Sequence, residues 1–239
     1  MESLLSQFGP VVVILPLVGF TLLAVGLVRA NAQRLRAQRE QMQRMGYTPL
    51  ANAPEELTAR IAVLRGRSPK VIDLRNVSER SLYDGHIYVF DVIDKKGNEK
   101  TTVGMRVVAV IAPALRLPRL HLFPRLDARH RRGWMAKAAE KLVRWAATQA
   151  GLQPLEVAIS PAFDDRYWVF GNDARAVREF LGNGRGTRLA GLEVPYTIST
   201  QGDTFTIEVT PIRAKRNTHA ALEVERRIED AKRVLSWFA

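Results

Sequence analysis

The sequence contains no cysteine. Disulfide bonds, thiolate metal sites and a cysteine nucleophile are therefore excluded, and the absence fits a reducing compartment. The four histidines, His86, His121, His130 and His219, are scattered, and none has the HxH or HExxH spacing of a metal site. The G-x-S-x-G pattern of a serine nucleophile is also absent. The sequence thus predicts no catalytic residue, no metal and no cofactor.

Charged residues are missing from Ser3 to Val28. The central part of this stretch reads PVVVILPLVGFTLLAVGLV and begins at Pro10. A bilayer core of about 30 Å needs roughly 20 predominantly apolar residues in a helix, so the run is long enough to span it. Pro16 lies inside the run, and a membrane helix tolerates proline through local adjustment. We therefore expect one transmembrane helix near the N-terminus.

The residues that flank the apolar run predict its orientation. An acidic residue, Glu2, precedes the run, whereas five arginines follow it, Arg29, Arg34, Arg36, Arg39 and Arg44. The positive-inside tendency keeps such a basic flank in the cytoplasm. The acidic start and the length of the run disfavour a signal peptide cleaved near residues 30–32. We expect a single-pass protein of the inner membrane, with its N-terminus outside, a helix and basic stalk in 1–44, and a cytoplasmic domain in 45–239.

The region 45–239 mixes helix and strand patterns. Apolar residues alternate from 103 to 111, which is the period of a half-buried strand. Pro118 and Pro124 flank another candidate strand and place it at a sheet edge. The expected strands are 71–77, 86–93, 101–111, 117–123, 157–159, 167–170, 196–200 and 204–210, and the expected helices are 30–45, 54–65, 134–150, 173–181 and 220–238. Hairpin-type connections favour an α+β fold with a mainly antiparallel sheet packed with helices.

Basic charge predominates, with 36 Lys and Arg against 24 Asp and Glu, a net charge of +12. Such a chain attracts anionic partners, and the planar fork of arginine suits phosphate. Six arginines between 116 and 132 form the densest group, and Lys137, Lys141 and Arg144 extend it. The candidate residues for binding lipid or a partner are Arg29, Arg34, Arg36, Arg39, Arg116, Arg119, Arg125, Arg129, Arg131 and Arg132. A solvated, soluble surface is the alternative interpretation.

Three other features have structural and functional interpretations. The segment 182–187, GNGRGT, resembles a phosphate loop but follows a predicted helix and lacks the GKS or GKT ending, so it is interpreted as a turn. Asp91, His121 and Asp165 are the residues from which a site could assemble in three dimensions. The aromatic pair 237–238 either docks on the core or contacts the membrane interface, where tryptophan is favoured.

Three segments carry a resemblance to known proteins. They are LPRLHLFP at 117–124, the stretch from Phe163 to Gly171 with RYWVFG followed by Asp173 and Arg178, and a hairpin turn at 202–203. Across about residues 70–212 the chain resembles a loose group of bacterial membrane proteins with a transmembrane helix and a cytosolic α+β domain of unknown function. The resemblance implies a membrane-tethered α+β module and no catalytic residue.

These observations favour a non-enzymatic module that binds a protein or an anionic lipid at the inner membrane surface. The protein partner could be another protein or a second copy in a homo-oligomer. Nucleic acid is disfavoured because no helix-turn-helix, zinc finger or aromatic stacking motif is present. The alternatives are a subunit of a larger membrane complex and a membrane-surface enzyme with a site assembled from distant residues.

Overall fold

The computed structural model describes residues 29, 32–33, 35–94, 105–125, 134–209 and 220–239. The chain divides into two units, Met1–Met45 and Gly46–Ala239. In the first unit, residues 35–44 are helical, and Arg44 pairs with Glu40 one turn earlier, at 3.8 Å. The transmembrane helix predicted within residues 10–28 lies outside the described residues.

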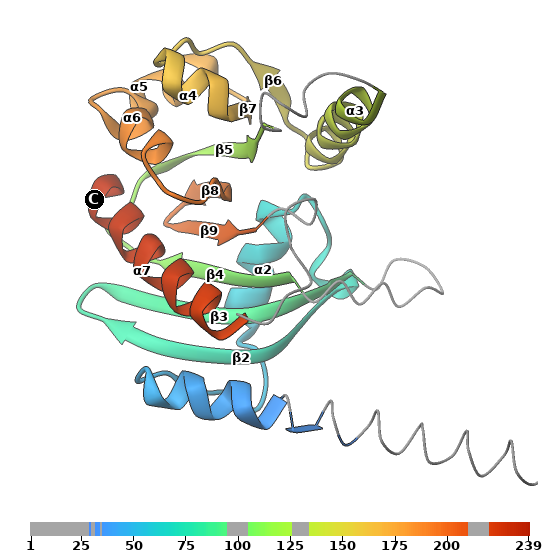
Figure 1. Ribbon diagram of the computed structural model, residues 1–239, viewed down its shortest axis with the longest axis vertical. Helices are drawn as coiled ribbons and strands as arrows, with labels where there is room; N and C mark the ends of the chain where they lie inside the picture. The colour runs from blue at the N-terminus through green and yellow to red at the C-terminus, as the bar shows by residue number, and fades with distance from the viewer. Residues whose placement is uncertain (1–28, 30–31, 34, 95–104, 126–133, 210–219) are drawn as a thin grey trace, which may run out of the picture. The chain divides into compact units, whose positions relative to one another are not determined.

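The unit Gly46–Ala239 contains one nine-stranded sheet with helices against it (Figure 1). Its elements are β1 (Thr48–Pro49), α2 (Glu55–Leu64), the 3-10 turn η1 (Pro69–Val71), β2 (Ile72–Leu82), β3 (Gly85–Asp94), β4 (Met105–Ile111), β5 (Leu117–Pro124), α3 (Trp134–Gln149), β6 (Gln153–Leu155), α4 (Pro161–Arg166), β7 (Tyr167–Gly171), α5 (Ala174–Leu181), α6 (Arg185–Ala190), β8 (Thr197–Gly202), β9 (Thr204–Glu208) and α7 (Ala220–Phe238). The strand order is β1-β2-β3-β4-β9-β8-β5-β7-β6. Every pair is antiparallel. The predicted α+β class with a large antiparallel sheet is confirmed.

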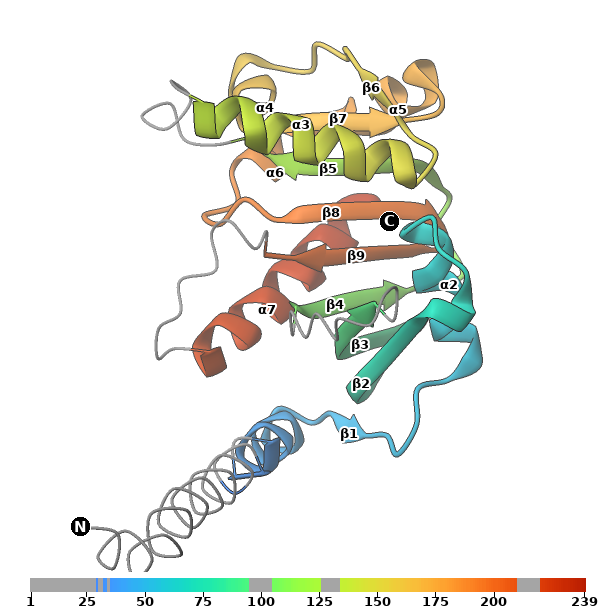
Figure 2. The ribbon, with the colours of Figure 1, turned by 90° about the vertical axis from the view of Figure 1, so that its right-hand side faces the viewer.

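Helices lie on both faces of the sheet (Figure 2). On one face, α2 packs Leu57 and Ile61 into a core with Ala109 of β4. On the opposite face, Phe238 at the end of α7 contacts Phe205 of β9, with ring centroids 5.3 Å apart. Ala109 pairs with Thr206, the residue after Phe205. Because side chains alternate between the two faces along a strand, Phe205 and Ala109 lie on opposite faces. Strands β4 and β9 are therefore covered from both sides.

The α2 face also carries α3. Ala147 of α3 packs against Phe170 of β7, and Phe170 lies across from His121 on the same face as Ala109. The stretch of sheet between α2 and α3 comprises parts of β8 and β9 (Figure 2). On the opposite face, α5 joins α7 through the contact of Phe180 with Phe238, at 4.8 Å between ring centroids.

Several predictions of local structure are wrong. The strand expected at an edge, β5, lies inside the sheet between β8 and β7. Its Pro118 falls at a register shift between Leu117 and Leu120, and a proline at such an irregularity breaks no ladder hydrogen bond. Residues 157–159 are not a strand; the strand in that region is β6.

The expected turn at 182–187 contains the start of a helix, α6. Gly184 is the residue before this helix and has a left-handed φ of 80°, which glycine adopts without strain. Arg185 then donates from Nε to the carbonyl of Trp237 at 2.8 Å, and its guanidinium lies 5.3 Å from the ring of Phe180. The segment therefore holds the end of α7. Phe238, which is 6% exposed, docks on the core.

Candidate functional site

The predicted arginines of the sheet unit are distributed along β5. Arg116 precedes the strand and donates from Nη1 to the carbonyls of Pro113 and Leu115, at 2.6 and 2.7 Å. Arg119, within the strand, donates from Nη2 to the carbonyl of Ala150 at 2.5 Å. These two guanidinium groups therefore help to hold the backbone at one end of β5.

Arg125 lies at the other end of β5. Six residues of extended chain separate it from Arg119, which is about 20 Å at the usual rise per residue. Arg125 donates from Nε to the carbonyl of Tyr167 at 3.0 Å, and its guanidinium lies 5.9 Å from the ring centroid of Trp168. Arg116 and Arg119 thus lie at one end of β5, and Arg125 follows its other end.

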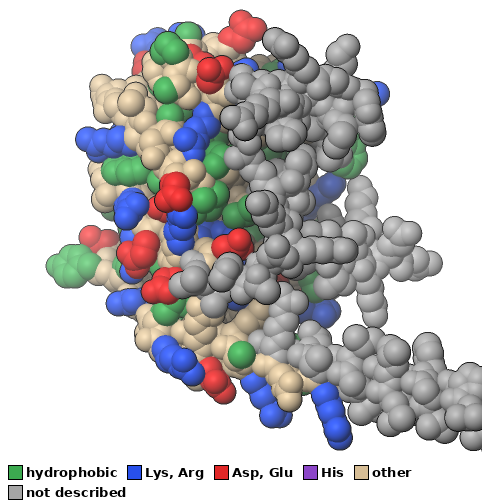
Figure 3. Space-filling view, viewed as in Figure 1, with side chains coloured by type: hydrophobic (Ala, Val, Ile, Leu, Met, Phe, Trp, Pro, Cys, Tyr) green, Lys and Arg blue, Asp and Glu red, His purple; other side chains and the backbone are tan. Residues whose placement is uncertain are grey.

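The remaining predicted arginines are not part of this arrangement. Arg29, Arg36 and Arg39 are exposed and belong to the first unit. Arg34, Arg129, Arg131 and Arg132 lie outside the described residues. On the face shown in Figure 3, the coloured basic and acidic side chains are interspersed, with no field of a single sign.

Arg125 borders a groove of about 650 Å³ between α3, the edge strand β6 and β7. The lining residues come from segments far apart in the sequence, namely Arg125, Glu140, Arg144, Pro154, Leu155, Glu156, Val157, Ala158, Asp164, Tyr167, Trp168, Val169 and Phe170. Arg144 and Glu140 lie one helical turn apart on α3 and form an ion pair at 2.9 Å. The groove therefore combines an aromatic and aliphatic lining with charged groups of both signs.

Two of the three carboxylates of this groove already have structural partners. Asp164 lies in the first turn of α4, and its Oδ1 accepts the backbone N–H of Ile159 at 3.3 Å. Glu140 accepts both Nε and Nη2 of Arg144. Among the residues described here, no group of three His, Cys, Asp or Glu side chains could hold a metal ion. The groove lining thus consists of aromatic, aliphatic and charged side chains.

The three residues proposed for an assembled site do not converge. Asp91 lies on β3 and His121 on β5, and β4, β9 and β8 run between them. Four inter-strand spacings correspond to about 19 Å. Asp165 belongs to α4, on the β7 side of the sheet.

His121 is itself a buried core residue, only 6% exposed. Burial lowers the pKa of its imidazole to about 4; a hydrogen bond to the backbone of Leu64 opposes this shift, and the nearby Arg65 and Arg119 guanidinium groups add to it. The Nε2 atom is buried without a hydrogen-bond partner in the part of the chain that the structure describes. The imidazole is therefore neutral at pH 7.

His121 lies in a buried row of cross-strand partners whose three central members are polar. No local sequence pattern indicated this row. The row crosses the α2 and α3 face of the sheet through successive cross-strand partners, Ala109, Thr206, Ser199, His121 and Phe170. Thr206 and Ser199 are each 5% exposed. Thr206 and Glu208 alternate with apolar residues in the sequence, and the side of β9 on which they lie is buried.

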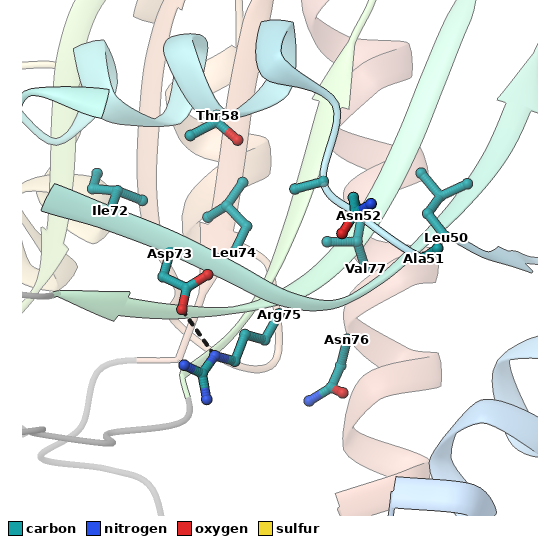
Figure 4. Close-up of a pocket in the computed structure, with 11 residues that line it drawn as sticks. Leu50, Ala51, Asn52, Thr58, Ile72, Asp73, Leu74, Arg75, Asn76 and Val77 are labelled. Atoms are coloured by element: carbon teal, nitrogen blue, oxygen red, sulfur yellow. Dashed lines mark hydrogen bonds and ion pairs between the residues drawn. The ribbon is translucent and has the colours of Figure 1, made fainter. Parts of the chain in front are cut away.

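A second, smaller hollow of about 440 Å³ lies beside β2 (Figure 4). One wall is the connection from β1 to α2, and the other is the strand itself. The lining residues are Leu50, Ala51, Asn52, Ala53, Thr58, Ile72, Asp73, Leu74, Arg75, Asn76 and Val77. Figure 4 shows Ile72 and Leu74 on the side of α2, and Asp73 and Arg75 on the opposite side.

The chain is an α+β protein built on a single antiparallel sheet with two grooves beside it. No family model matches the chain, and no curated protein matches it. The chain is similar to a solved structure, the crystal structure of the mycobacterial trehalose monomycolate transport factor A, TtfA. The TM-score is 0.51 at 11% identity, over 85% of this chain and 93% of that one. This likeness shows a shared fold.

Within the described residues, no helix has both the length and the apolar character needed to cross a membrane.

Proposed function

We propose that this chain is a membrane-anchored binding module. Residues 10–28 would form the anchor, and the sheet unit would bind a partner at the cytoplasmic surface of the inner membrane. The uncharged apolar run and the arginines that follow it support this topology. The shared fold with TtfA, which is named as a transport factor, is compatible with an accessory role at a membrane.

The groove between α3 and β6–β7 carries the proposal of binding. Its lining is aromatic at Trp168 and Phe170, and charged groups of both signs border it. On α3, the helix that borders the groove, Trp145 is 54% exposed. Exposed tryptophan and arginine side chains are the types enriched at the energetic centres of protein interfaces.

A protein segment fits this groove better than a lipid headgroup does. An anionic headgroup favours a site of one sign, whereas Arg125 and Arg144 share the groove with Glu140, Glu156 and Asp164. A protein segment can match both signs and also fill the apolar lining. We therefore place a protein partner first and an anionic lipid second.

The test is site-specific photocrosslinking in cells. A photoreactive amino acid at position 156, in the groove, should capture a discrete protein, whereas the same amino acid at position 179 on α5 should not. Arg144→Glu should abolish the crosslink at 156. The matched control is Arg175→Glu, since Arg175 also forms a helical ion pair at 2.9 Å, with Glu179, but lies away from the groove.

The outcomes separate the alternatives. A crosslink that Arg144→Glu leaves unchanged, or the absence of any captured protein at 156, would contradict groove binding. Several captured proteins that co-purify at fixed stoichiometry in mild detergent would indicate the subunit of a larger membrane complex. Binding to anionic vesicles that Arg144→Glu weakens, without a protein crosslink, would assign the groove to lipid.

The proposed topology has its own test, which the absence of native cysteine makes direct. Glu179→Cys introduces a single thiol at a side chain that is 67% exposed. A membrane-impermeant maleimide should label this thiol only after the cells are opened. Labelling of intact cells would place the sheet unit outside and refute the cytoplasmic location.

A further inference from the structure

One stretch of the sheet edge has no neighbouring strand. Strand β2 pairs with β3 along its length, but β1 covers it only through Thr48 opposite Glu79 and Pro49 opposite Ser78. A last hydrogen bond joins Leu50 N–H to the carbonyl of Val77 at 2.9 Å. Within the described residues, nothing pairs with the outer backbone edge of 72–76, where the 440 Å³ hollow lies.

A β-bulge at Asn76 separates the part of β2 that β1 covers from the part that has no neighbouring strand. The register with β3 shifts between Arg75 and Ser78, and Asn76 has a left-handed φ of 52°. Asparagine tolerates this conformation better than most residues do. Its Nδ2 donates to Asp91 Oδ2 on β3 at 2.7 Å, which fixes the bulge. The open stretch is thus delimited by a bulge that the structure holds in place.

Charges of alternating sign lead to this open edge. Arg106 on β4 lies opposite Asp91 on β3, and Asp91 lies opposite Arg75 on β2. The Arg106 Nε to Asp91 Oδ1 distance is 3.5 Å. The row reads positive, negative, positive, and it ends on Arg75, whose side chain is 61% exposed. A negative group beyond the edge would continue the alternation.

We infer that the partner at this edge is a second copy of the chain, paired antiparallel with β2 about a two-fold axis at Leu74. In this register Asp73 of each copy lies opposite Arg75 of the other, because the two residues are equidistant from the centre. Both side chains lie on the same face, since Arg75 Nε already contacts Asp73 Oδ2 at 2.9 Å (Figure 4). Two symmetric ion pairs would therefore form, and each charge row would continue into the second copy.

The sequence of the edge distinguishes it from a protected one. Proteins commonly block edges with proline, with charged side chains or with bulges, and here the bulge between Arg75 and Ser78 only ends the open stretch. The stretch 72–75 reads Ile-Asp-Leu-Arg, and its two charges attract each other in an antiparallel self-pairing. The β1 strands of the two copies would end the new ladder on both sides, which limits it to about five residues.

A ladder of this length gives a small interface and hence a weak dimer in dilute solution. Confinement of two chains to one surface would raise their effective concentration and favour pairing. The inference goes beyond the proposed function and does not depend on the α3 groove, because β2 and β6 are at opposite sides of the sheet order.

The decisive experiment uses charge reversal in the full chain in mild detergent. Sedimentation should show a dimer for the natural sequence, with the dimer fraction falling as salt rises. Asp73→Arg presents two arginines and Arg75→Asp two aspartates, so each variant alone should lose at least tenfold in dimer affinity. An equimolar mixture of the two variants should recover the dimer, since opposite charges then face each other at both positions.

Recovery of the dimer by mixing distinguishes the proposal from damage to the fold. Mixing cannot restore the contact between residues 73 and 75 within either chain, so a fold damaged by its loss would stay damaged. A monomeric natural protein at all accessible concentrations would overturn the proposal. Single variants that dimerise as well as the natural protein would also overturn it, and so would a mixture that stays monomeric.

Cysteine crosslinking tests the register. Directly opposite residues in an antiparallel pair have Cα atoms about 4.5–5.5 Å apart, within the range for a disulfide. A mixture of Asp73→Cys and Arg75→Cys proteins should form a disulfide-linked heterodimer and keep one ion pair. Each protein alone should crosslink at least several-fold less, and Arg175→Cys should not crosslink. Equal crosslinking within the pure Asp73→Cys protein would refute this register.

Discussion

The two faces of the central strands differ in what they bury. On the α7 face, successive cross-strand partners are all aliphatic, Val108, Ile207, Ile198, Leu122 and Val169. One residue further along each strand, the α2 and α3 face has the row from Ala109 through Thr206, Ser199 and His121 to Phe170. Two rows of similar burial thus have different chemistry. Packing against α7 and α5 helps to bury the first row. The second row buries hydroxyl and imidazole groups, for which burial is costly unless partners are present.

The polar face obtains some of these partners from α2 and the residue after it. Arg65 Nη2 lies 2.6 Å from Glu208 Oε2, and Arg60 contacts both carboxylate oxygens of Asp203, at 3.2 and 2.6 Å. These pairs fasten α2 to the β8–β9 hairpin. Helix α2 is therefore held against the sheet both by the buried Leu57 and Ile61 side chains and by these charge pairs.

The largest expected effect is on the apolar face. Phe205→Ala removes a fully buried ring that contacts Phe238, and it should lower the free energy of unfolding by about 3–5 kcal/mol. Urea unfolding followed by tryptophan fluorescence measures the loss. The neighbouring change Thr206→Val, on the polar face, should alter stability by less than about 1 kcal/mol. Equal losses from the two variants would contradict the difference between the faces.

The next effect is a pH dependence that belongs to the polar face. Because the folded-state pKa of His121 is lowered from 6.5 to about 4, the folded protein resists binding a proton that the unfolded chain accepts. Its contribution is therefore fully present above pH 6.5 and is lost as the pH falls to 4, by about 3 kcal/mol in order of magnitude. His121→Leu should remove this component of the acid sensitivity. An unchanged pH profile in this variant would place the sensitivity elsewhere.

A smaller effect tests the charge pairs directly. Glu208→Gln should weaken the contact with Arg65 and lower the unfolding free energy by about 1 kcal/mol, since the Arg65 side chain is 31% exposed and partly screened by solvent. Thermal unfolding at low and high salt measures it, and the difference between the variant and the natural protein should shrink as salt rises. A salt-independent difference would indicate that packing of Glu208, and not its charge, is what stabilises the hairpin.

The smallest effect gives the baseline for these comparisons. Arg175→Ala breaks an ion pair on α5 whose side chains are 88% and 67% exposed. Such helical surface pairs contribute about 0.5 kcal/mol or less, so the unfolding midpoint should barely move. A loss comparable to that of Glu208→Gln would mean that burial does not separate the two pairs.

The sequence predicted most elements because their patterns are local. The alternation of Val107, Ala109 and Ile111 specified β4, and the spacing of Val224, Ile228 and Ala231 specified α7. What local pattern could not indicate is that both faces of β9 are buried. The alternation of Thr206 and Glu208 with apolar residues indicates that the strand has two sides, but not what covers each side.

The candidate sites depended on distant contacts and were therefore harder to predict. The basic segment from Arg116 supplied Arg125 to the groove, but Trp168 and Glu156 came to the same place through the pairing of β5, β7 and β6. The sequence pattern did not single out Asp73 and Arg75, because two charged residues on a strand are common. Their position on an unpaired edge is visible only in the fold.

The strand order has a consequence for how the protein folds. Strands β4 and β5 are consecutive in the chain, yet the hairpin β8–β9 lies between them and pairs Val107 with Glu208 across 101 residues. Contacts of such long sequence separation form slowly, because loop closure must precede them. Until the hairpin inserts, β4 lacks its pairing with β9 and β5 lacks its pairing with β8. The chain is then most exposed to misassembly with other copies, and a chaperone that holds those edges apart would speed productive folding.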